Sequence, residues 1–298
     1  MILSCFFYNL SDKLIVTFMN EIKFDLTKKW TDYHLVAFDT ETSGAYAIES
    51  EIIELGAVKY FQGQIIDRFQ TLLKPKEFLQ ESNIRIHGIT NEMVASAPNM
   101  SEKINQFYQF IDGSLLLAHH APFDLGFLSY AFESHQVELP HTLNLCSSLL
   151  SRALLSTTNH KLQTLIKELK LIGGDAHRAY DDAYACFQVF EKCLLKISPE
   201  DSIKRILDIQ TKDLSWHNYR ILTSNNEKLA SLAKQCLDKN EIEIFYLSGQ
   251  TKGKKRRITP YGIVRNPDGD YINAFCHIDN QRKRFYIDKI QFDSQFSF

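Results

Sequence analysis

The sequence lacks the features that would place it in a membrane or in a disulfide-stabilised class. No stretch of the 298 residues approaches about 18 consecutive apolar residues, so we expect nothing to span a membrane. The six cysteines are scattered and form no Cys-x-x-Cys pair, which argues against a zinc ribbon or a redox motif. Reduced, buried cysteines are therefore expected, and with them a cytoplasmic protein.

The chain also lacks an excess of basic charge. Its formal net charge is −2, so no overall positive field attracts nucleic acid, and any such contact must come from local patches. The N-terminal residues MILSCFFYNLSDK are apolar but have neither a basic start nor a small-residue cleavage site, which argues against a signal peptide. A chain of 298 residues suffices for about two domains.

Strand and helix patterns alternate between residues 30 and 196. Short apolar strands are predicted over 35–38 and 115–118, and a hairpin over 52–61 and 64–73 around Gln62-Gly63. Residues 83–90 are predicted to form a loop. Helical spacing is found over 91–94, 100–111, 123–132, 143–155, 160–169 and 179–195. This alternation predicts an α/β domain in which helices flank a mixed sheet.

The pattern changes after residue 197. Residues 198–225 are polar with little periodicity and are predicted to be a linker, followed by a helix over 226–237. From residue 241 the segments IEIFYLSG, RRITPYGIV, DYINAFCHI and RKRFYIDKIQF are separated by Gly, Asn and Asp, which predicts a small all-β unit. The expected organisation is an N-terminal extension that adds a strand or hairpin (1–32), the α/β domain (33–197), the linker (198–225) and the β domain (226–298).

The stretch Leu35–Gly44, LVAFDTETSG, carries the first chemical signal. Asp39 and Glu41 are two residues apart at the end of a buried strand, so both side chains can leave it on the same face. Two such carboxylates repel each other, and a divalent cation such as Mg²⁺ or Mn²⁺ relieves that repulsion. By itself the pair is equally typical of a strand that ends in an acidic turn.

Further acidic residues follow other predicted elements. Asp124 comes after a buried strand, and His177 precedes Asp182 by five residues. Asp124 alone is also typical of the first turn of a helix, where the dipole favours it. Four carboxylates and one histidine from separate segments are what two-metal phosphodiester hydrolysis needs.

Four segments resemble the DEDDh group of 3′–5′ exonucleases in the DnaQ-like superfamily, which includes the proofreading subunit of bacterial replicative DNA polymerase. They are FDTETSG (38–44), IRIHGIT (84–90), AHHAPFD (118–124) and HRAYDDA (177–183). The resemblance covers about residues 33–196 and implies an RNase H-like fold. It implies that two Mg²⁺ or Mn²⁺ ions are held by Asp39, Glu41, Asp124 and Asp182, with His177 as the general base. It also places Thr40, Thr42, His87, His119 and Phe123 along the terminal nucleotide, although for each of these five a structural role has an equal claim.

One residue departs from the family pattern. The third motif usually has asparagine after its histidine, and this chain has His120 there. An imidazole can still donate one hydrogen bond, but it does not place a donor and an acceptor on one planar group as an amide does, so the departure concerns fine positioning.

Residues 226–293 resemble a WYL domain, a small β-barrel module of the SH3/Sm-like kind. The name-giving Trp-Tyr-Leu stands here as Asp270-Tyr271-Ile272, and Lys289 replaces the usual arginine. Eight cations gather in this unit, namely Lys252, Lys254, Lys255, Arg256, Arg257, Arg282, Lys283 and Arg284, among the aromatic residues Tyr261, Tyr271, Phe285 and Tyr286. This mixture predicts a surface for nucleic acid or a nucleotide. The alternatives are solvated charged turns and a module used for packing or dimerisation.

The expected function is metal-dependent removal of nucleoside 5′-monophosphates from the 3′ end of nucleic acid, with single-stranded DNA as the preferred substrate and the C-terminal module in a regulatory role. The expected partners are nucleic-acid 3′ ends and a DNA polymerase or repair complex. Two alternatives stay open: an RNA-directed exoribonuclease of the same fold, and a non-cleaving regulator. A non-cleaving copy would be expected to have lost a ligand, and all five chemical residues are present.

Overall fold

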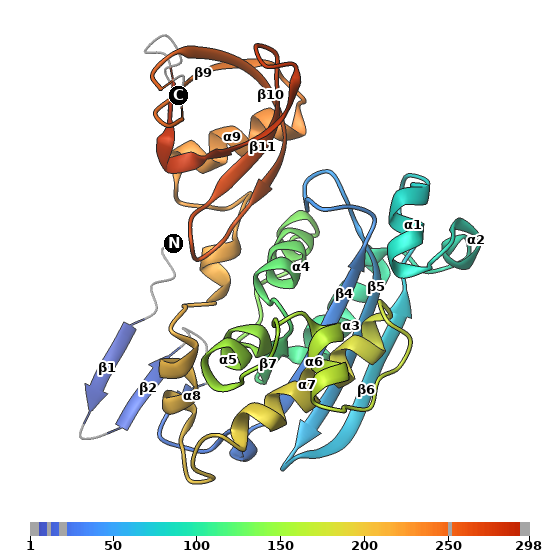
Figure 1. Ribbon diagram of the computed structural model, residues 1–298, viewed down its shortest axis with the longest axis vertical. Helices are drawn as coiled ribbons and strands as arrows, with labels where there is room; N and C mark the ends of the chain where they lie inside the picture. Colours follow the sequence, from blue (N-terminus) through green and yellow to red (C-terminus); the bar gives the residue numbers. More distant parts are fainter. Residues whose placement is uncertain (1–5, 11–12, 18–22, 250–251, 293–298) are drawn as a thin grey trace. The chain divides into compact units, whose positions relative to one another are not determined.

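The computed structural model describes residues 6–10, 13–17, 23–249 and 252–292 (Figure 1). The chain divides into two compact units. The first comprises the described parts of Met1–Glu41, Ile52–Asp124 and Pro140–Leu214, and the second those of Thr42–Glu51, Leu125–Leu139 and Ser215–Phe298. The domain limits expected from the sequence stay a prediction.

The first unit is built on a five-stranded mixed sheet with the order β6-β5-β4-β7-β8. Strand β4 (Leu35–Thr42) is parallel to β7 (Leu115–Ala118), which is parallel to β8 (Leu143–Cys146). Strands β5 (Ile52–Phe61) and β6 (Gln64–Leu72) form the predicted antiparallel hairpin. The predicted α/β class with a mixed sheet is confirmed.

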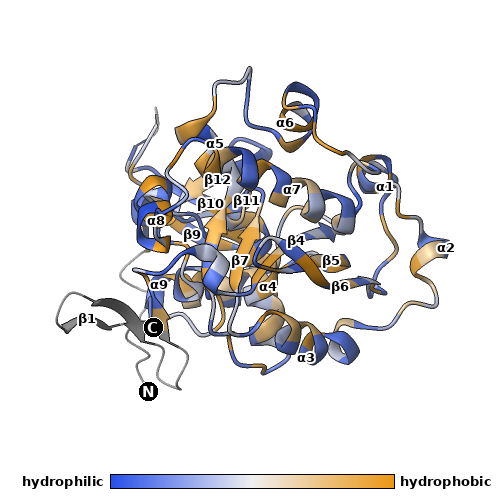
Figure 2. Ribbon diagram, turned by 90° about the horizontal axis from the view of Figure 1, so that it is seen from below, coloured by the Kyte–Doolittle hydropathy of each residue, from blue (hydrophilic) through white to orange (hydrophobic). Residues whose placement is uncertain are grey.

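Helices cover both faces of this sheet (Figure 1). Leu35 and Ala37 of β4 join the apolar cluster that contains Phe187 and Phe190 of α7 (Ala179–Leu194). On the opposite face the ring of Phe38 lies 6.5 Å from that of Phe107 in α3 (Met100–Ile111). Figure 2 shows the matching pattern, with orange residues on the central strands and both colours on the helices. Burial of these side chains, each contributing about 1.5–3 kcal/mol, holds the layers together.

The remaining helices of the first unit are short. They are α1 (Glu81–His87), α2 (Asn91–Val94), α5 (Ser147–Leu154), α6 (Leu162–Glu168), α8 (Ile203–Gln210) and the 3₁₀ turn η1 (Trp30–Asp32). Helix α4 (Pro122–Ser134) begins in the first unit and ends in the second.

Two sequence-based assignments in the first unit are wrong. Residues 83–90 are not a loop throughout, because α1 runs to His87 and ends at Gly88, whose φ of 69° gives the helix a left-handed cap. The predicted helix over 143–155 is β8 followed by α5. In the stretch expected to be a linker, α8 buries Ile203 and Ile206 in the core of the first unit.

The expected N-terminal strands are present. Strands β1 (Phe6–Leu10), β2 (Lys13–Thr17) and β3 (Lys23–Asp25) form a small antiparallel sheet. Residues 1–5, the start of the segment judged not to be a signal peptide, lie outside the described residues. Among the described residues, no helix combines the length and the apolar character needed to cross a membrane.

The second unit contains an all-antiparallel sheet with the order β12-β11-β10-β9-β13. The strands are β9 (Ile242–Tyr246), β10 (Lys255–Val264), β11 (Tyr271–Cys276), β12 (Gln281–Tyr286) and β13 (Ile290–Phe292), accompanied by η2 (Trp216–Tyr219) and η3 (Ile287–Lys289). Helix α9 (Glu227–Leu237) buries Leu229 and Leu232 against the core face of the sheet. The predicted small β domain is confirmed.

Candidate active site

The acidic pair Asp39 and Glu41 lies at the end of β4. Successive side chains of a strand point to opposite faces, and Leu35 and Ala37, which share the face of the acidic pair, pack against α7. Both carboxylates therefore point to the face that α7 covers. The strand continues through both residues to Thr42, beyond the four residues expected from the sequence.

Asp124 reaches the same region from β7. The chain leaves β7 at Ala118 and turns through His120, whose carbonyl oxygen accepts from the amide of Phe123 at 3.0 Å. Helix α4 thus begins just beyond the strand, and Asp124 in its first turn is buried. Its Oδ1 accepts from the amide nitrogen of Thr40 at 3.0 Å and from the Thr40 hydroxyl at 2.8 Å. These bonds tie Asp124 to β4 between the two residues of the acidic pair.

His120 has a backbone conformation that suits the residue usually found there. Its φ is 68°, in the left-handed region, which asparagine, aspartate and histidine enter more readily than other non-glycine residues. The departure from the family pattern therefore changes the side-chain chemistry, while the turn itself is formed.

His177 and Asp182 come from the loop before α7 and from its first turn. Asp182 is buried, and its amide donates to the carbonyl oxygen of Arg178 at 3.0 Å. His177 is exposed and has a φ of 60°. One ligand atom from each of Glu41, His177 and Asp182 lies within 4.8 Å of the other two. The structure thus brings the predicted base together with two of the four predicted carboxylates.

Burial and mutual repulsion disturb the protonation of these carboxyl groups. Burial, followed by the charges of Asp124 and Glu41, holds the pKa of Asp39 well above its usual range. Burial, followed by Asp182, raises the pKa of Glu41 to about 8. Burial also raises the pKa of Asp124 to about 7, against the bonds from Thr40 that lower it.

The same effects reach Asp182, whose pKa burial raises to about 6. Four carboxylates in one largely buried cluster cannot all be charged near neutral pH without a compensating cation. Their oxygens are the hard ligands that a divalent cation prefers, so the residues present fit such an ion.

His87, in the loop predicted to contact the substrate, is buried at the end of α1. Its Nδ1 accepts from the amide of Ile89 at 3.0 Å, so the neutral ring carries its proton on Nε2. Burial lowers the pKa of His87, which favours that neutral form. Nε2 is buried and has no hydrogen-bond partner among the described residues.

His119 is held differently. Its Nδ1 lies 2.8 Å from the hydroxyl of Ser147, and its Nε2 lies 2.9 Å from the carbonyl oxygen of His160. Burial lowers the pKa of His119 to about 4, so the ring is neutral. Both ring nitrogens therefore have partners within the protein.

The last two residues predicted to contact the substrate are Thr42 and Phe123. Thr42 belongs to the second unit, where its hydroxyl donates to the carbonyl oxygen of Gly44 at 2.7 Å. The ring of Phe123 is 37% exposed.

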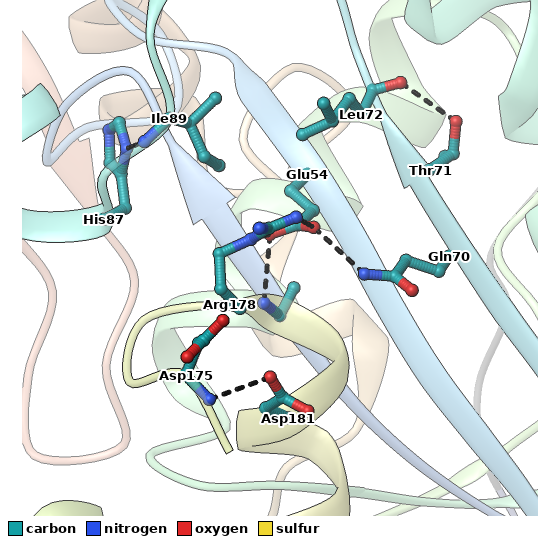
Figure 3. A network of polar contacts seen from close by, with 10 residues as sticks. Glu54, Gln70, Thr71, Leu72, His87, Ile89, Asp175, Arg178 and Asp181 are labelled. Carbon is teal, nitrogen blue, oxygen red and sulfur yellow. Dashed lines mark hydrogen bonds and ion pairs between the residues drawn. The ribbon is translucent and has the colours of Figure 1, made fainter. Parts of the chain in front are cut away.

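Sequence reasoning missed a buried ion pair next to this cluster (Figure 3). Glu54 of β5 has no exposed surface, and its carboxylate accepts from Nη2 of Arg178 at 2.8 Å and from Nε at 3.1 Å. The available signal was a single charged residue within the apolar run IIELGAV. Asp181, the neighbour of Asp182 in the sequence, accepts from the amide of Asp175 at 3.0 Å.

The C-terminal sheet presents an aromatic and basic face. Cζ of Arg282 lies 5.0 Å from the ring centroid of Tyr261, and Cζ of Arg284 lies 4.0 Å from that of Tyr271. The rings of Tyr271 and Tyr286 are 5.9 Å apart. These residues, named here the arginine–tyrosine face, share one side of the sheet because paired residues of β11 and β12 point the same way.

Other members of the predicted basic cluster do not belong to this face. Arg256 is 7% exposed and pairs with Asp279, which Lys283 also contacts at 2.7 Å. Lys255 pairs with Glu243, and Arg257 pairs with Glu241. Phe285 is buried in the core. The expectation that all these cations and aromatic residues belong to one surface is therefore wrong for Arg256 and Phe285, because strand alternation turns these two side chains inward.

A mixed five-stranded sheet with an acidic cluster at the end of its central strand is the architecture of the RNase H-like fold. The chain belongs to the exonuclease family, since the family model described as "Exonuclease" matches residues 36–190. A second model, described as "WYL domain", matches residues 227–292.

Similar proteins include DNA polymerases III of the PolC type. The protein of Halalkalibacterium halodurans is 32% identical over 252 residues, which is 82% of this chain and 17% of that relative. The protein of Oceanobacillus iheyensis is 38% identical over 220 residues, 71% of this chain and 15% of that relative. The chain thus spans about a sixth of the length of these relatives.

Among solved structures, E. coli exonuclease I in complex with a dT13 oligonucleotide superposes with a TM-score of 0.50 at 14% identity, over 89% of this chain and 66% of that one. The zinc-bound form of the E. coli exonuclease I complex with single-stranded DNA gives 0.51 at 14% identity, over 87% and 65%. At these identities the likeness concerns the fold.

Proposed function

We propose that the protein is a metal-dependent 3′–5′ exonuclease that hydrolyses phosphodiester bonds at the 3′ end of single-stranded DNA and releases nucleoside 5′-monophosphates. One observation carries the proposal: the atoms of Glu41, His177 and Asp182 lie within 4.8 Å of one another, in the unit that also holds Asp39 and Asp124. These residues come from three of the four motifs that resemble the DEDDh exonucleases.

Asp39, Glu41, Asp124 and Asp182 would hold two Mg²⁺ or Mn²⁺ ions. When bound, such ions polarise the scissile phosphate and stabilise the charge on the attacking and leaving oxygens. Thr40 orients the carboxylate of Asp124 through its amide and hydroxyl groups. His177 accepts a proton from the attacking water through a ring nitrogen, and its exposure leaves that nitrogen open to solvent.

The residues along the terminal nucleotide make different kinds of contact with it. His87 donates from Nε2 to an oxygen of the nucleotide, because that N–H has no partner among the residues described. Phe123 offers part of its ring for stacking, and Thr42 lines the segment after the acidic pair. His119, whose ring nitrogens are held by Ser147 and His160, would line the terminal nucleotide through its ring rather than through a hydrogen bond.

The C-terminal module is the regulatory part of this proposal. The arginine–tyrosine face combines cations with aromatic rings, which suits single-stranded nucleic acid because every base has a face that can stack. The module would hold the strand or a nucleotide ligand. As partners we propose nucleic-acid 3′ ends and a DNA polymerase or repair complex, and as location the cytoplasm, which suits the free, buried cysteines described.

The test is degradation of oligonucleotides labelled at either end. Single-stranded DNA and RNA of the same sequence are incubated with Mn²⁺, with Mg²⁺ and with EDTA. A ladder that shortens a 5′-labelled DNA from its 3′ end, with mononucleotide release from the 3′-labelled strand and no reaction in EDTA, is expected. Preference for RNA would favour the exoribonuclease alternative. Binding of DNA without cleavage in either metal would favour the non-cleaving regulator.

A further inference from the structure

The loop that carries His177 ends on the buried ion pair (Figure 3). Glu54 accepts two bonds from Arg178, the residue that follows His177, and a third from the amide of Ala179 at 3.1 Å. A fourth comes from Nε2 of Gln70 at 3.3 Å. One carboxylate on β5 thereby fixes the last residue of the loop and the first residue of α7.

Burial of the Glu54 carboxylate costs free energy on folding. A carboxylate removed from water loses its hydration, and an apolar side chain at Glu54 would fill the interior without that loss. Strand β5 and helix α7 are closely packed two residues further along the strand. A Cβ on Gly56 would lie 2.1 Å from the amide nitrogen of Tyr180. Helix α7 thus meets β5 at backbone distance, at the point where the ion pair holds it.

The other end of the loop is fastened as well. Asp181 accepts from the amide of Asp175 at 3.0 Å, and Gly174 lies so close that a Cβ there would be 2.3 Å from the carboxyl carbon of Asp181. Further back, Gln188 exchanges two hydrogen bonds with the backbone of Ile172, at 2.9 and 2.8 Å. Residues 172–178 are therefore held on both sides of His177.

His177 itself has a backbone conformation that few residues other than glycine adopt. Its φ of 60° is uncommon for a residue other than glycine, and such a conformation persists where the surrounding structure enforces it. The fastenings on either side supply that enforcement. Asp182 lies in the first turn of the helix that follows, so the same contacts also fix the position of a predicted metal ligand.

We propose that Glu54 is a positioning residue for the hydrolysis, which holds Arg178 and the first turn of α7 so that His177 and Asp182 face Asp39 and Glu41. The inference rests on the proposed nuclease function. Asp181 and Gln188 act with Glu54 by fastening the preceding part of the loop. Displacement of a catalytic group by about 1 Å is enough to lower turnover by about 10²-fold.

The experiment separates positioning from stability. Glu54→Gln keeps the shape and an acceptor for the Ala179 amide but removes the charge that holds Arg178. The double variant Glu54→Met/Arg178→Met replaces the pair by apolar side chains, which is expected to restore thermal stability. Asp279→Asn is the matched control, because it removes the charge that pairs with the buried Arg256 in the second unit.

Steady-state kinetics on single-stranded DNA are measured where circular dichroism shows every variant folded. Glu54→Gln should lose about 10²-fold in kcat with KM within about twofold. The double variant should regain its melting temperature and not its kcat, and Asp279→Asn should keep its kcat. Asp181→Asn, which retains the acceptor for Asp175, should stay close to wild type, whereas Asp181→Leu should not.

Hydrogen exchange of the backbone amides of residues 172–182 measures how firmly this segment is held, independently of catalysis. Glu54→Gln should raise the exchange rates across this segment. Asp279→Asn should leave the exchange rates of this segment unchanged. An inactive wild-type protein with this exchange pattern would refute the proposed function alone. An active wild type whose Glu54→Gln variant keeps both its kcat and its protection would overturn the positioning role, as would an equal loss of kcat in Asp279→Asn.

Discussion

The ring of Tyr46 occupies the space that a side chain at Gly262 would need, since a Cβ on Gly262 would lie 2.5 Å from Cγ of Tyr46. Tyr46 also meets Tyr261 edge-on, with ring centroids 5.6 Å apart. The pairing of β10 with β11 shifts register between Pro260 and Gly262, which marks a β-bulge at this point. The segment that follows Glu41 in the chain is therefore seated on the C-terminal sheet.

Replacement of Gly262 by alanine should destabilise the second unit. The added methyl group must displace the ring of Tyr46, and overpacking of this kind costs about 1–3 kcal/mol. Differential scanning calorimetry measures the change. Gly126→Ala is the control, because nothing lies within 4 Å of that Cβ and the helical site should gain about 0.5–1 kcal/mol. A Gly262→Ala variant as stable as wild type would contradict the packing.

Asp124→Asn should reduce nuclease activity to the level of wild-type protein in EDTA. The amide oxygen can still accept from Thr40, so the fold is retained while a metal-binding charge is lost. Without metal the variant should be more stable than wild type, since one buried charge is gone. Asp67→Asn, on the exposed strand β6, should leave both quantities unchanged. Substantial activity of the Asp124 variant in Mg²⁺ would refute its assignment.

His177→Ala should lower kcat by about 10²–10⁴, the usual contribution of a general base. Calorimetric titration with Mn²⁺ should show little loss of affinity, because the four carboxylates remain. Added imidazole should restore part of the turnover by entering the exposed position of the ring. His135→Ala provides the control, and equal rates in the two variants would show that His177 is not the base.

Without divalent cations, thermal stability should fall as the pH rises from about 4 to about 8, because the pKa values of Asp182, Asp124 and Glu41 are raised to about 6, 7 and 8. A raised pKa means that the folded state holds protons which the unfolded chain releases above about pH 4, so their stabilisation is present in acid and lost on titration. Saturating Mn²⁺ should oppose this loss, because the cation binds the ionised carboxylates. Melting curves in EDTA and in Mn²⁺ that stay a constant distance apart across this range would contradict the prediction.

Arg282→Glu together with Arg284→Glu should weaken binding of single-stranded DNA by about tenfold or more. Fluorescence anisotropy with the Asp124→Asn protein measures binding without cleavage. In the active protein the same change should raise KM for long substrates and leave KM for a dinucleotide unchanged. Lys167→Glu/Lys234→Glu makes an equal change of charge on exposed helix positions. Equal affinities of the two double variants would remove the arginine–tyrosine face from the proposal.

Much of the active-site unit could be predicted because its signals are local. The alternation of Leu35, Ala37, Asp39 and Glu41 places the acidic pair on the face that helices cover, and the hairpin around Gln62-Gly63 follows from turn chemistry. Helix α1 was missed because seven residues show too little periodicity, although Gly88 marks its end.

Other features depend on partners that are distant in sequence. Glu54 and Arg178 are 124 residues apart, so neither sequence context reveals that one neutralises the other. Asp181 is next to Asp182, and only the path of the preceding loop decides which of the two caps that loop. For Arg256 and Phe285, the register of β10 and β12 decides that the side chains point inward.

The ion pairs of the C-terminal unit limit how strongly salt can affect DNA binding. Each phosphate neutralised on a single strand contributes a slope of about −0.7 to the dependence of log affinity on log salt concentration. Eight cations in contact with phosphate would give a slope near −5.6, whereas Lys252, Lys254, Arg282 and Arg284 would give about −2.8. Since Lys255, Arg256, Arg257 and Lys283 already neutralise carboxylates, counterion release should be smaller. The module would thus retain a strand at ionic strengths that dissociate a purely electrostatic binder.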